Sequence, residues 1–114
     1  MPMINIKTNV SVSSEQENTI MSALGKSISL IRGKSEAWLM VGIDGGSSLC
    51  FREDKKTPCA FVNVSIYGSA STNEYEALTG AVTTLLNQQL GIRSDRIYVC
   101  YQETMNWGYS GHNF

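Results

Sequence analysis

Apolar residues recur along this chain with two different spacings. Between residues 14 and 33 they fall every three or four positions, which predicts a helix with Ile20, Leu24, Ile28 and Ile31 on one face. A second helix is predicted from about residue 74, and its apolar side comprises Leu78, Ala81, Val82, Leu85, Leu86 and Leu90. Shorter apolar runs predict strands over residues 3–9, 38–43, 59–67 and 96–101, with residues 49–51 as a short hairpin return.

Polar residues and glycines mark where the helices begin and end. Ser14, with Glu17 three positions later, predicts a capping box at the start of the first helix. Gly33 suits a left-handed C-cap, and Lys34 is favourable beside the last carbonyl groups of that helix. Gly91 ends the second helix in the same way.

The elements follow the order strand, helix, strand, and this order then repeats. Each half has the pattern of a βαβ unit with a right-handed crossover. We therefore predict an α+β fold in one domain spanning residues 1–114, with a four-stranded mixed sheet and two helices on one face. In the first strand the apolar set is Met3, Ile4 and Ile6, with Asn5 and Lys7 on the other face. Apolar residues on the uncovered face of the sheet would lie in water, so we expect an oligomer.

Composition and charge exclude several classes of function. The net charge is −1, and Lys55-Lys56 is the only cluster of basic residues, which argues against nucleic-acid binding. No apolar run is long enough to cross a bilayer, and the first residues lack the pattern of a leader peptide, so we expect no membrane partner.

The cysteines and the single histidine make a metal or nucleophile site improbable. Cys50, Cys59 and Cys100 lack metal-type spacing, and His112 lies far from them in sequence. We expect three reduced thiols of a cytosolic-type protein and no metal or other cofactor.

The first two residues, Met1 and Pro2, permit two interpretations. An initiator methionine is normally removed when a small residue follows, which would leave Pro2 with a titratable secondary amine. A free α-amino group has a pKa of roughly 7.7–8.0, and burial lowers it, so Pro2 could act as a base. Alternatively, Pro2 only starts an edge strand, where a missing N–H costs nothing. On this dipeptide alone the edge-strand interpretation is favoured.

Several short motifs, in their order along the chain, resemble the macrophage migration inhibitory factor family of the tautomerase superfamily. These motifs are Met1-Pro2-Met3, Thr8-Asn9-Val10, Gly33-Lys34, Pro58-Cys59-Ala60-Phe61, Asp95-Arg96-Ile97-Tyr98, Trp107-Gly108-Tyr109-Ser110-Gly111 and Asn113-Phe114. The resemblance extends over essentially the whole chain. It implies a homotrimer in which three sheets line a central barrel, with an active site at each subunit interface.

The resemblance also implies an activity and a set of site residues. Family members interconvert keto and enol forms of phenylpyruvate-like acids and tautomerise dopachrome-type compounds, with the N-terminal proline as base. Pro2 matches that proline, and Lys34 matches the lysine that pairs with the substrate carboxylate. Tyr67, beside Ile66, would supply a backbone N–H to the same carboxylate, and an alignment shifted by one residue remains open.

Other residues are implied as walls of the pocket. Tyr98 and Cys100 would reach a neighbouring subunit's pocket, although the family commonly has asparagine where Cys100 stands. The other residues expected to line the pocket are Met3, Trp38, Trp107, Tyr109 and Phe114, and ordinary core or trimer-interface packing remains an alternative for the aromatic residues, for Trp38 in particular.

Two departures from the family pattern affect these expectations. Cys59 is followed by Ala60-Phe61-Val62, so the second cysteine of the Cys-x-x-Cys pair is missing and thiol–disulfide chemistry should be absent. The loop that follows Phe51 is charged.

Three functions remain open. They are a tautomerase, a cytokine-like ligand of a cell-surface receptor with a vestigial pocket, and a plain trimeric binding module. We expect the chain in the cytoplasm and also secreted without a signal peptide.

Overall fold

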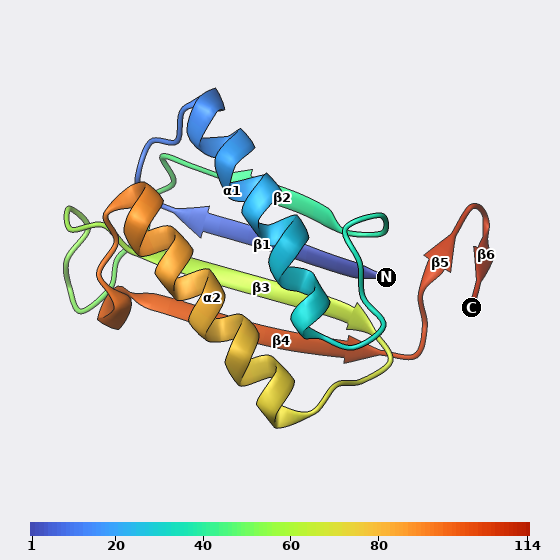
Figure 1. Cartoon of the computed structure of the whole chain (residues 1–114). Helices are drawn as coiled ribbons and strands as arrows, with labels where there is room; N and C mark the ends of the chain where they lie inside the picture. Colours follow the sequence, from blue (N-terminus) through green and yellow to red (C-terminus); the bar gives the residue numbers. More distant parts are fainter.

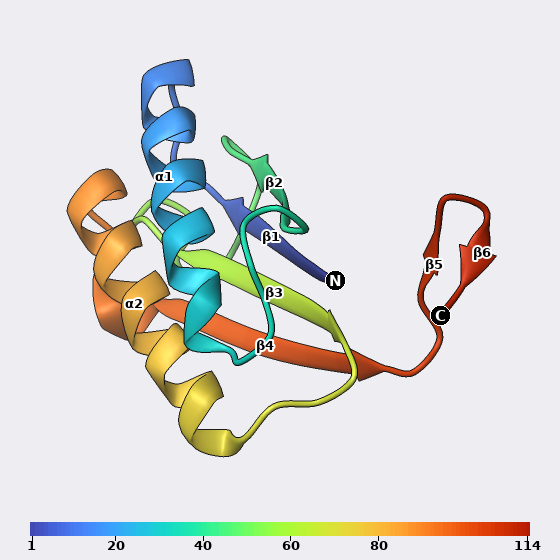
Figure 2. The same ribbon diagram turned by 45° about the vertical axis from the view of Figure 1, so that its right-hand side comes forward.

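A four-stranded sheet carries both helices on one face (Figures 1 and 2). The computed structural model describes all residues, Met1–Phe114. The first half comprises β1 (Pro2–Thr8), α1 (Ser14–Ser27), the 3-10 turn η1 (Ile28–Leu30) and β2 (Met40–Asp44). The second half comprises β3 (Ala60–Tyr67), α2 (Thr72–Leu90), the 3-10 turn η2 (Ser94–Arg96) and β4 (Ile97–Thr104). Two short strands, β5 (Gly108–Tyr109) and β6 (His112–Asn113), form a terminal hairpin.

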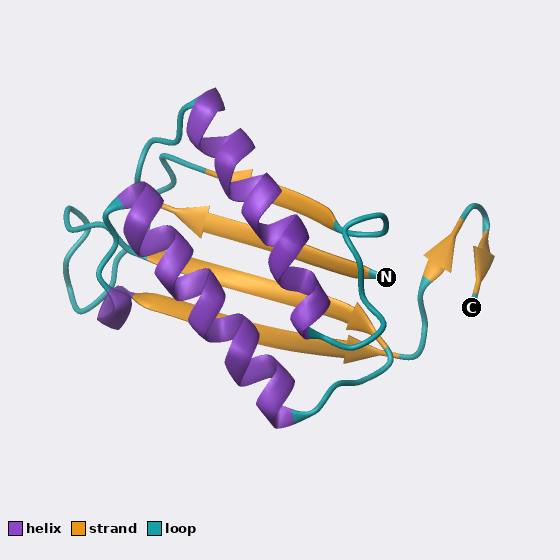
Figure 3. Cartoon of the chain, in the orientation of Figure 1, coloured by secondary structure: helices purple, strands orange, loops and turns teal.

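The strands lie in the order β2-β1-β3-β4. β1 is parallel to β2, and β3 is parallel to β4, as a helical crossover between the strands of each half requires. The central strands β1 and β3 run antiparallel and join the two halves. This arrangement confirms the predicted α+β fold with a mixed sheet, and Figure 3 shows both helices as one layer over it.

The core lies between the sheet and the two helices. The four residues predicted for the inner face of the first helix, Ile20, Leu24, Ile28 and Ile31, are all buried. They meet Ile4 and Ile6 of β1, Val62, Val64 and Ile66 of β3, and Leu78, Val82 and Leu86 of α2. Neither α1 nor α2 has the length and apolarity that a bilayer-crossing helix needs.

The first strand differs from the prediction in the side that Met3 occupies. The residues of β1 that face the helices are Pro2, Ile4, Ile6 and Thr8, since their burial alternates with that of their neighbours. Strand side chains alternate with a period of two, so Met3 shares the open face with Asn5 and Lys7.

The helix starts are shifted from their predicted positions. Ser13, not Ser14, caps α1: its hydroxyl accepts from the Gln16 N–H at 3.1 Å, and the Gln16 side chain accepts from the Ser13 N–H at 2.9 Å. The predicted box with Glu17 is therefore wrong by one position. In α2, Ser71 and Glu74 form the same reciprocal cap, so the helix begins at Thr72, two residues before the predicted start.

The first helix also ends differently. The α-helix stops at Ser27 and continues as η1, so Gly33 (φ 82°) lies in the next turn rather than at the helix C-cap. The C-cap of α2 is Gly91 with φ 66°, as predicted.

Two strand predictions are wrong in their extent. Trp38 belongs to a turn in which its N–H donates to the Ser35 carbonyl, and β2 starts only at Met40. Residues 49–51 form no hairpin with β2, because Phe51 pairs only with Asp54 in a tight turn.

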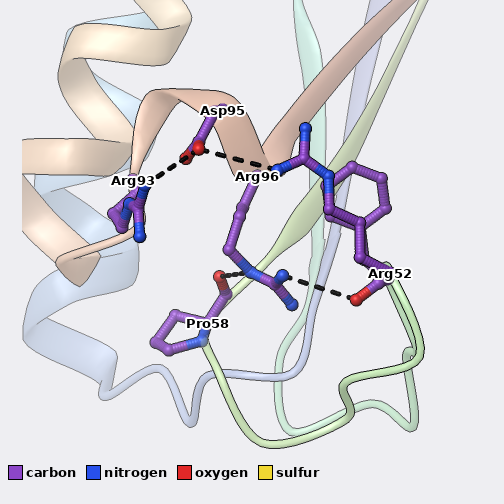
Figure 4. A network of polar contacts seen from close by, with 6 residues as sticks. Arg52, Pro58, Arg93, Asp95 and Arg96 are labelled. Carbon is purple, nitrogen blue, oxygen red and sulfur yellow. Dashed lines mark hydrogen bonds and ion pairs between the residues drawn. The ribbon is translucent and has the colours of Figure 1, made fainter.

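Arg96 holds the loop between residues 51 and 58 (Figure 4). Its side chain is 7% exposed. The guanidinium donates to the carbonyl oxygens of Pro58 at 3.0 Å, Thr57 at 3.2 Å, and Phe51 and Asp54 at 3.4 Å. The charged loop is thus fixed to the start of β4 through its backbone.

The open face of the sheet is more polar than expected. Apolar side chains lie toward its margins, where Met40, Phe61 and Tyr98 are exposed. Across the middle, Asn5 is paired with Asn63, and the buried Oδ1 of Asn63 has no hydrogen-bond partner. Burial of apolar surface is therefore a weaker reason for an oligomer than the sequence suggested.

Candidate active site

A cleft of about 350 Å³ lies at the end of the sheet where β1 begins. The N-terminus and the residues before β2 meet the C-terminal hairpin there, at one end of the molecule (Figure 1). The cleft is lined by Met1, Pro2, Met3, Ala37, Trp38, Leu39, Met40, Trp107, Gly108 and Tyr109. Its volume and mostly apolar lining are typical of sites for small organic molecules.

Pro2 is buried and lines this cleft. It starts β1 opposite Ile66 of β3, at a strand end where the missing N–H of proline is tolerated. Its position is therefore fixed by the central antiparallel pair of the sheet rather than by a loop.

Lys34 comes from the turn after η1 and lies beside the amine of Met1, although it is not among the residues that line the cleft. Gly33 supplies the positive φ that turns the chain, and the Lys34 N–H donates to the Ile31 carbonyl at 3.1 Å. The Lys34 Nζ then donates to the carbonyl oxygen of Tyr67 at 2.8 Å. The ammonium group is thereby held beside the end of β3.

The backbone carbonyl of Met1 accepts the hydrogen bond of the Tyr67 N–H at 3.1 Å. This N–H is the other polar backbone group of Tyr67 beside Lys34. Burial lowers the pKa of the Met1 α-amino group, and the charge of Lys34 and its hydrogen bond lower it further. An amine at this end of the chain thus meets surroundings that favour its neutral form.

Aromatic rings surround these groups. Tyr67 packs against Phe114 with ring centroids 5.5 Å apart, and Trp38 meets Tyr109 edge-to-face at 5.2 Å. Phe114 is also 6.4 Å from Tyr109, and its N–H donates to the Trp107 carbonyl, which closes the terminal hairpin. The hairpin therefore packs its aromatic residues against Trp38 and Tyr67.

The structure brings together most of the residues predicted for the site, but not all. Ile66 is fully buried in the core, so only its backbone lies at the site. In the sheet register, Tyr98 of β4 is paired with Phe61 of β3. Pro2 of β1 is paired with Ile66 of β3, which is in turn paired with Glu103 of β4. Tyr98 and Glu103 are five residues apart along β4, so Tyr98 lies about 17 Å along the strand direction from the position of Pro2. Tyr98 lines a separate pocket of about 110 Å³ at the opposite end of the sheet.

Cys100 also lies outside the cleft. It is on the same face of β4 as Tyr98, and its Sγ is 3.8 Å from the Gln102 Nε2. No group of three or more His, Cys, Asp or Glu side chains is arranged to hold a metal ion.

Sequence reasoning missed several residues of the site. Nothing in the spacing of these residues indicated that they line the cleft: Met1, Ala37, Leu39, Met40 and Gly108. Glu74 accepts the backbone N–H of Arg32 at 2.6 Å and so contacts the turn that carries Lys34. The Ser71-x-x-Glu74 spacing was visible in the sequence, but it predicts only a helix cap.

Fold and site together define a class: two βαβ units whose first strand starts at a proline in position 2 have the tautomerase-superfamily fold. The family model "Macrophage migration inhibitory factor (MIF)" matches residues 1–114. The chain therefore belongs to the macrophage migration inhibitory factor family, as its sequence motifs indicated.

Individual relatives agree with this assignment. The chain is 28% identical over 116 residues to the macrophage migration inhibitory factor of Meriones unguiculatus, covering 100% of this chain and 99% of that protein. The crystal structure of MIF2 from Leishmania major has a TM-score of 0.93 at 25% identity, covering 100% of this chain and 97% of that one. A homologue from Prochlorococcus marinus has a TM-score of 0.88 at 25% identity, with 98% of each chain covered.

Proposed function

We propose that this chain, once Met1 is removed, is a cofactor-independent keto–enol tautomerase with Pro2 as its general base. The observation that carries the proposal is the contact between Met1 and Tyr67. The Met1 carbonyl oxygen accepts a hydrogen bond from the Tyr67 N–H, beside the Lys34 ammonium group. Met1 thus places an oxygen acceptor where a substrate carboxylate would bind. Removing Met1 frees the N–H, enlarges the cleft and converts the nitrogen of Pro2 from an amide into an amine.

The surroundings favour a neutral amine at Pro2. Burial and the charge of Lys34 already lower the pKa of the amine at Met1. The Pro2 nitrogen is one residue further along the chain, at a buried position, so burial should also lower the pKa of its amine. A base with a pKa near the working pH is suited to proton transfer.

The proton transfer follows from this arrangement. The Pro2 nitrogen takes a proton from the carbon next to the ketone of a 2-oxo acid, and the bonding electrons move to the ketone oxygen. The resulting enolate then receives the proton on that oxygen, which gives the enol. Lys34 and the Tyr67 N–H hold the carboxylate, while the rings of Trp38, Trp107 and Tyr109 enclose an aromatic group such as that of phenylpyruvate.

The complete site is proposed to need a second copy of the chain. Tyr98 and Cys100 are too far from Pro2 to serve the cleft of their own subunit. In a homotrimer they would face a neighbouring cleft, with the hydroxyl of Tyr98 as wall or donor.

The test compares two forms of the same chain. We expect the processed protein, verified by intact mass, to turn over the enol of phenylpyruvate, and the Pro2→Gly variant to lose at least about 100-fold in rate, because general-base catalysis contributes that much. A chain that retains Met1 is the matched control and should be equally inactive. Equal rates for the processed wild type and Pro2→Gly would overturn the proposal.

A second candidate is a cytokine-like ligand of a cell-surface receptor. The name of the Meriones relative favours it, and the exposed Tyr109 and Phe114 on the terminal hairpin offer a contact surface. This function would require the protein to reach the outside of the cell. Receptor binding by the Pro2→Gly protein would separate it from catalysis, and absence of binding to any macrophage surface would contradict it.

A further inference from the structure

Two segments far apart in sequence are joined twice beside the proposed carboxylate site. The first connection is the hydrogen bond from Lys34 Nζ to the Tyr67 carbonyl. The second lies a few residues away on each segment, where the Arg32 N–H donates to Glu74 Oε2 at 2.6 Å. Together they close a ring through residues 32–34 and 67–74.

Glu74 has contacts on both sides of this ring. Its Oε1 accepts from the Ser71 N–H at 2.9 Å, which completes the cap of α2, while its Oε2 holds Arg32. These backbone hydrogen bonds, that from Arg32 foremost, lower the pKa of Glu74 to about 2. The carboxylate is therefore ionised under all ordinary conditions and able to accept from both N–H groups at once.

The turn that Glu74 holds has one backbone hydrogen bond of its own, from the Lys34 N–H to the Ile31 carbonyl at 3.1 Å. Around Gly33, no atom lies within 4 Å of the place where a Cβ would stand. Its φ is 82°, in the left-handed region that glycine adopts readily, so the turn depends on a conformationally free residue. Ile31, on the inner side, is anchored in the core. Between Ile31 and Lys34, the carboxylate of Glu74 is the side chain that fixes the backbone.

We propose that Glu74 is a positioning residue for the substrate carboxylate, acting through the turn of Lys34 rather than by contact with the substrate. This inference rests on the proposed carboxylate site of Lys34 and the Tyr67 N–H. Without Glu74, the turn at residues 32–34 loses its tie to α2, and Lys34 no longer keeps its place beside Tyr67. Misplacement of such a group by about 1 Å costs up to 100-fold.

Binding of a non-reacting pair of ligands tests this without reliance on catalysis. The probes are 3-phenylpropionate and its neutral analogue 3-phenylpropionamide, and their binding is followed by tryptophan fluorescence, because both tryptophans of the chain line the cleft. The proteins are the processed wild type, Glu74→Ala, Glu74→Gln and Ser71→Ala. Ser71→Ala is the matched control, since it removes the cap hydroxyl but leaves the Glu74 contact with Arg32.

We expect Glu74→Ala to weaken binding of the carboxylate about tenfold while binding of the amide changes less than about twofold. Glu74→Gln should lie between, because one amide oxygen replaces two carboxylate oxygens. Ser71→Ala should leave the ratio of the two dissociation constants at the wild-type value. Circular dichroism verifies that each variant is folded at the temperature of measurement.

Three results would overturn the inference. They are an unchanged ratio in Glu74→Ala, an equal change in Ser71→Ala, and a wild type that does not distinguish the carboxylate from the amide. Failure of the proposed function would give a different result. The processed chain would then bind the carboxylate in a Glu74-dependent way, but the wild type and Pro2→Gly would turn over the enol at equal rates.

Discussion

Arg96 is an almost buried cation without a carboxylate ion pair. Its partners are four backbone carbonyl groups of one loop, and its guanidinium also lies 5.2 Å from the centre of the Phe51 ring. Nearby, Arg93 pairs with Asp95 at 2.9 Å, but the Arg93 side chain is 72% exposed (Figure 4). Two arginines three residues apart should therefore contribute very differently to the free energy of unfolding.

Replacing Arg96 should destabilise the fold, whereas replacing Arg93 should not. We expect Arg96→Met to lower the free energy of unfolding by about 2–3 kcal/mol, because several carbonyl groups lose their donor in a part-buried place. Arg93→Ala should cost less than about 0.5 kcal/mol, as is usual for an exposed ion pair. Urea denaturation measures both, and equal midpoints for the two variants would contradict this account of the loop.

At the scale of elements, helix faces were more predictable than helix ends. The buried positions of α1 recur with the helical period, so their inner face is read directly from the sequence. The cap was misplaced because Ser13 and Ser14 are adjacent and are each followed three residues later by a suitable partner, Gln16 or Glu17. Sequence alone does not distinguish the two registers.

Replacement by alanine should have opposite effects on stability at two glycines, Gly80 inside α2 and Gly91 at its C-cap. Gly80 is inside the helix with open space around it, so Gly80→Ala should stabilise the protein by about 0.5–1 kcal/mol. Gly91 ends the helix at φ 66°, so Gly91→Ala should destabilise it by about 1 kcal/mol. Thermal unfolding should therefore shift upward in the first variant and downward in the second; shifts of the same sign would be inconsistent with the left-handed cap.

At the scale of the whole molecule, the site could be predicted only in part. The family motifs pointed to Pro2 and Lys34, because Pro2 stands at the start of a recognisable strand and Lys34 follows a glycine turn. The contact between Met1 and Tyr67 was not predictable, since it depends on the register of β1 against β3. The same register puts Pro2 and Tyr98 at opposite ends of the sheet, which no local pattern reveals.

Subunit mixing tests whether neighbouring copies share a site. Pro2→Gly and Tyr98→Ala chains should each form weakly active trimers, because each lacks one half of every site. Random mixing at equal amounts should restore about a quarter of the sites, since a complete site needs Pro2 from one chain and Tyr98 from its neighbour. Size-exclusion chromatography verifies the trimer, and activity no higher than the average of the two parents would show that Tyr98 does not act across an interface.

The antiparallel pairing of β1 with β3 also bears on how quickly the chain folds. The strands of each parallel pair are separated in sequence by one helix and its loops, whereas Pro2 and its partner Ile66 are separated by more than half of the chain. Closing a long loop costs entropy before any contact compensates for it, so docking of the halves should limit the refolding rate. Substitutions at Val62 or Val64 on β3 should then slow refolding, while substitutions on the outer strand β2 should mainly accelerate unfolding.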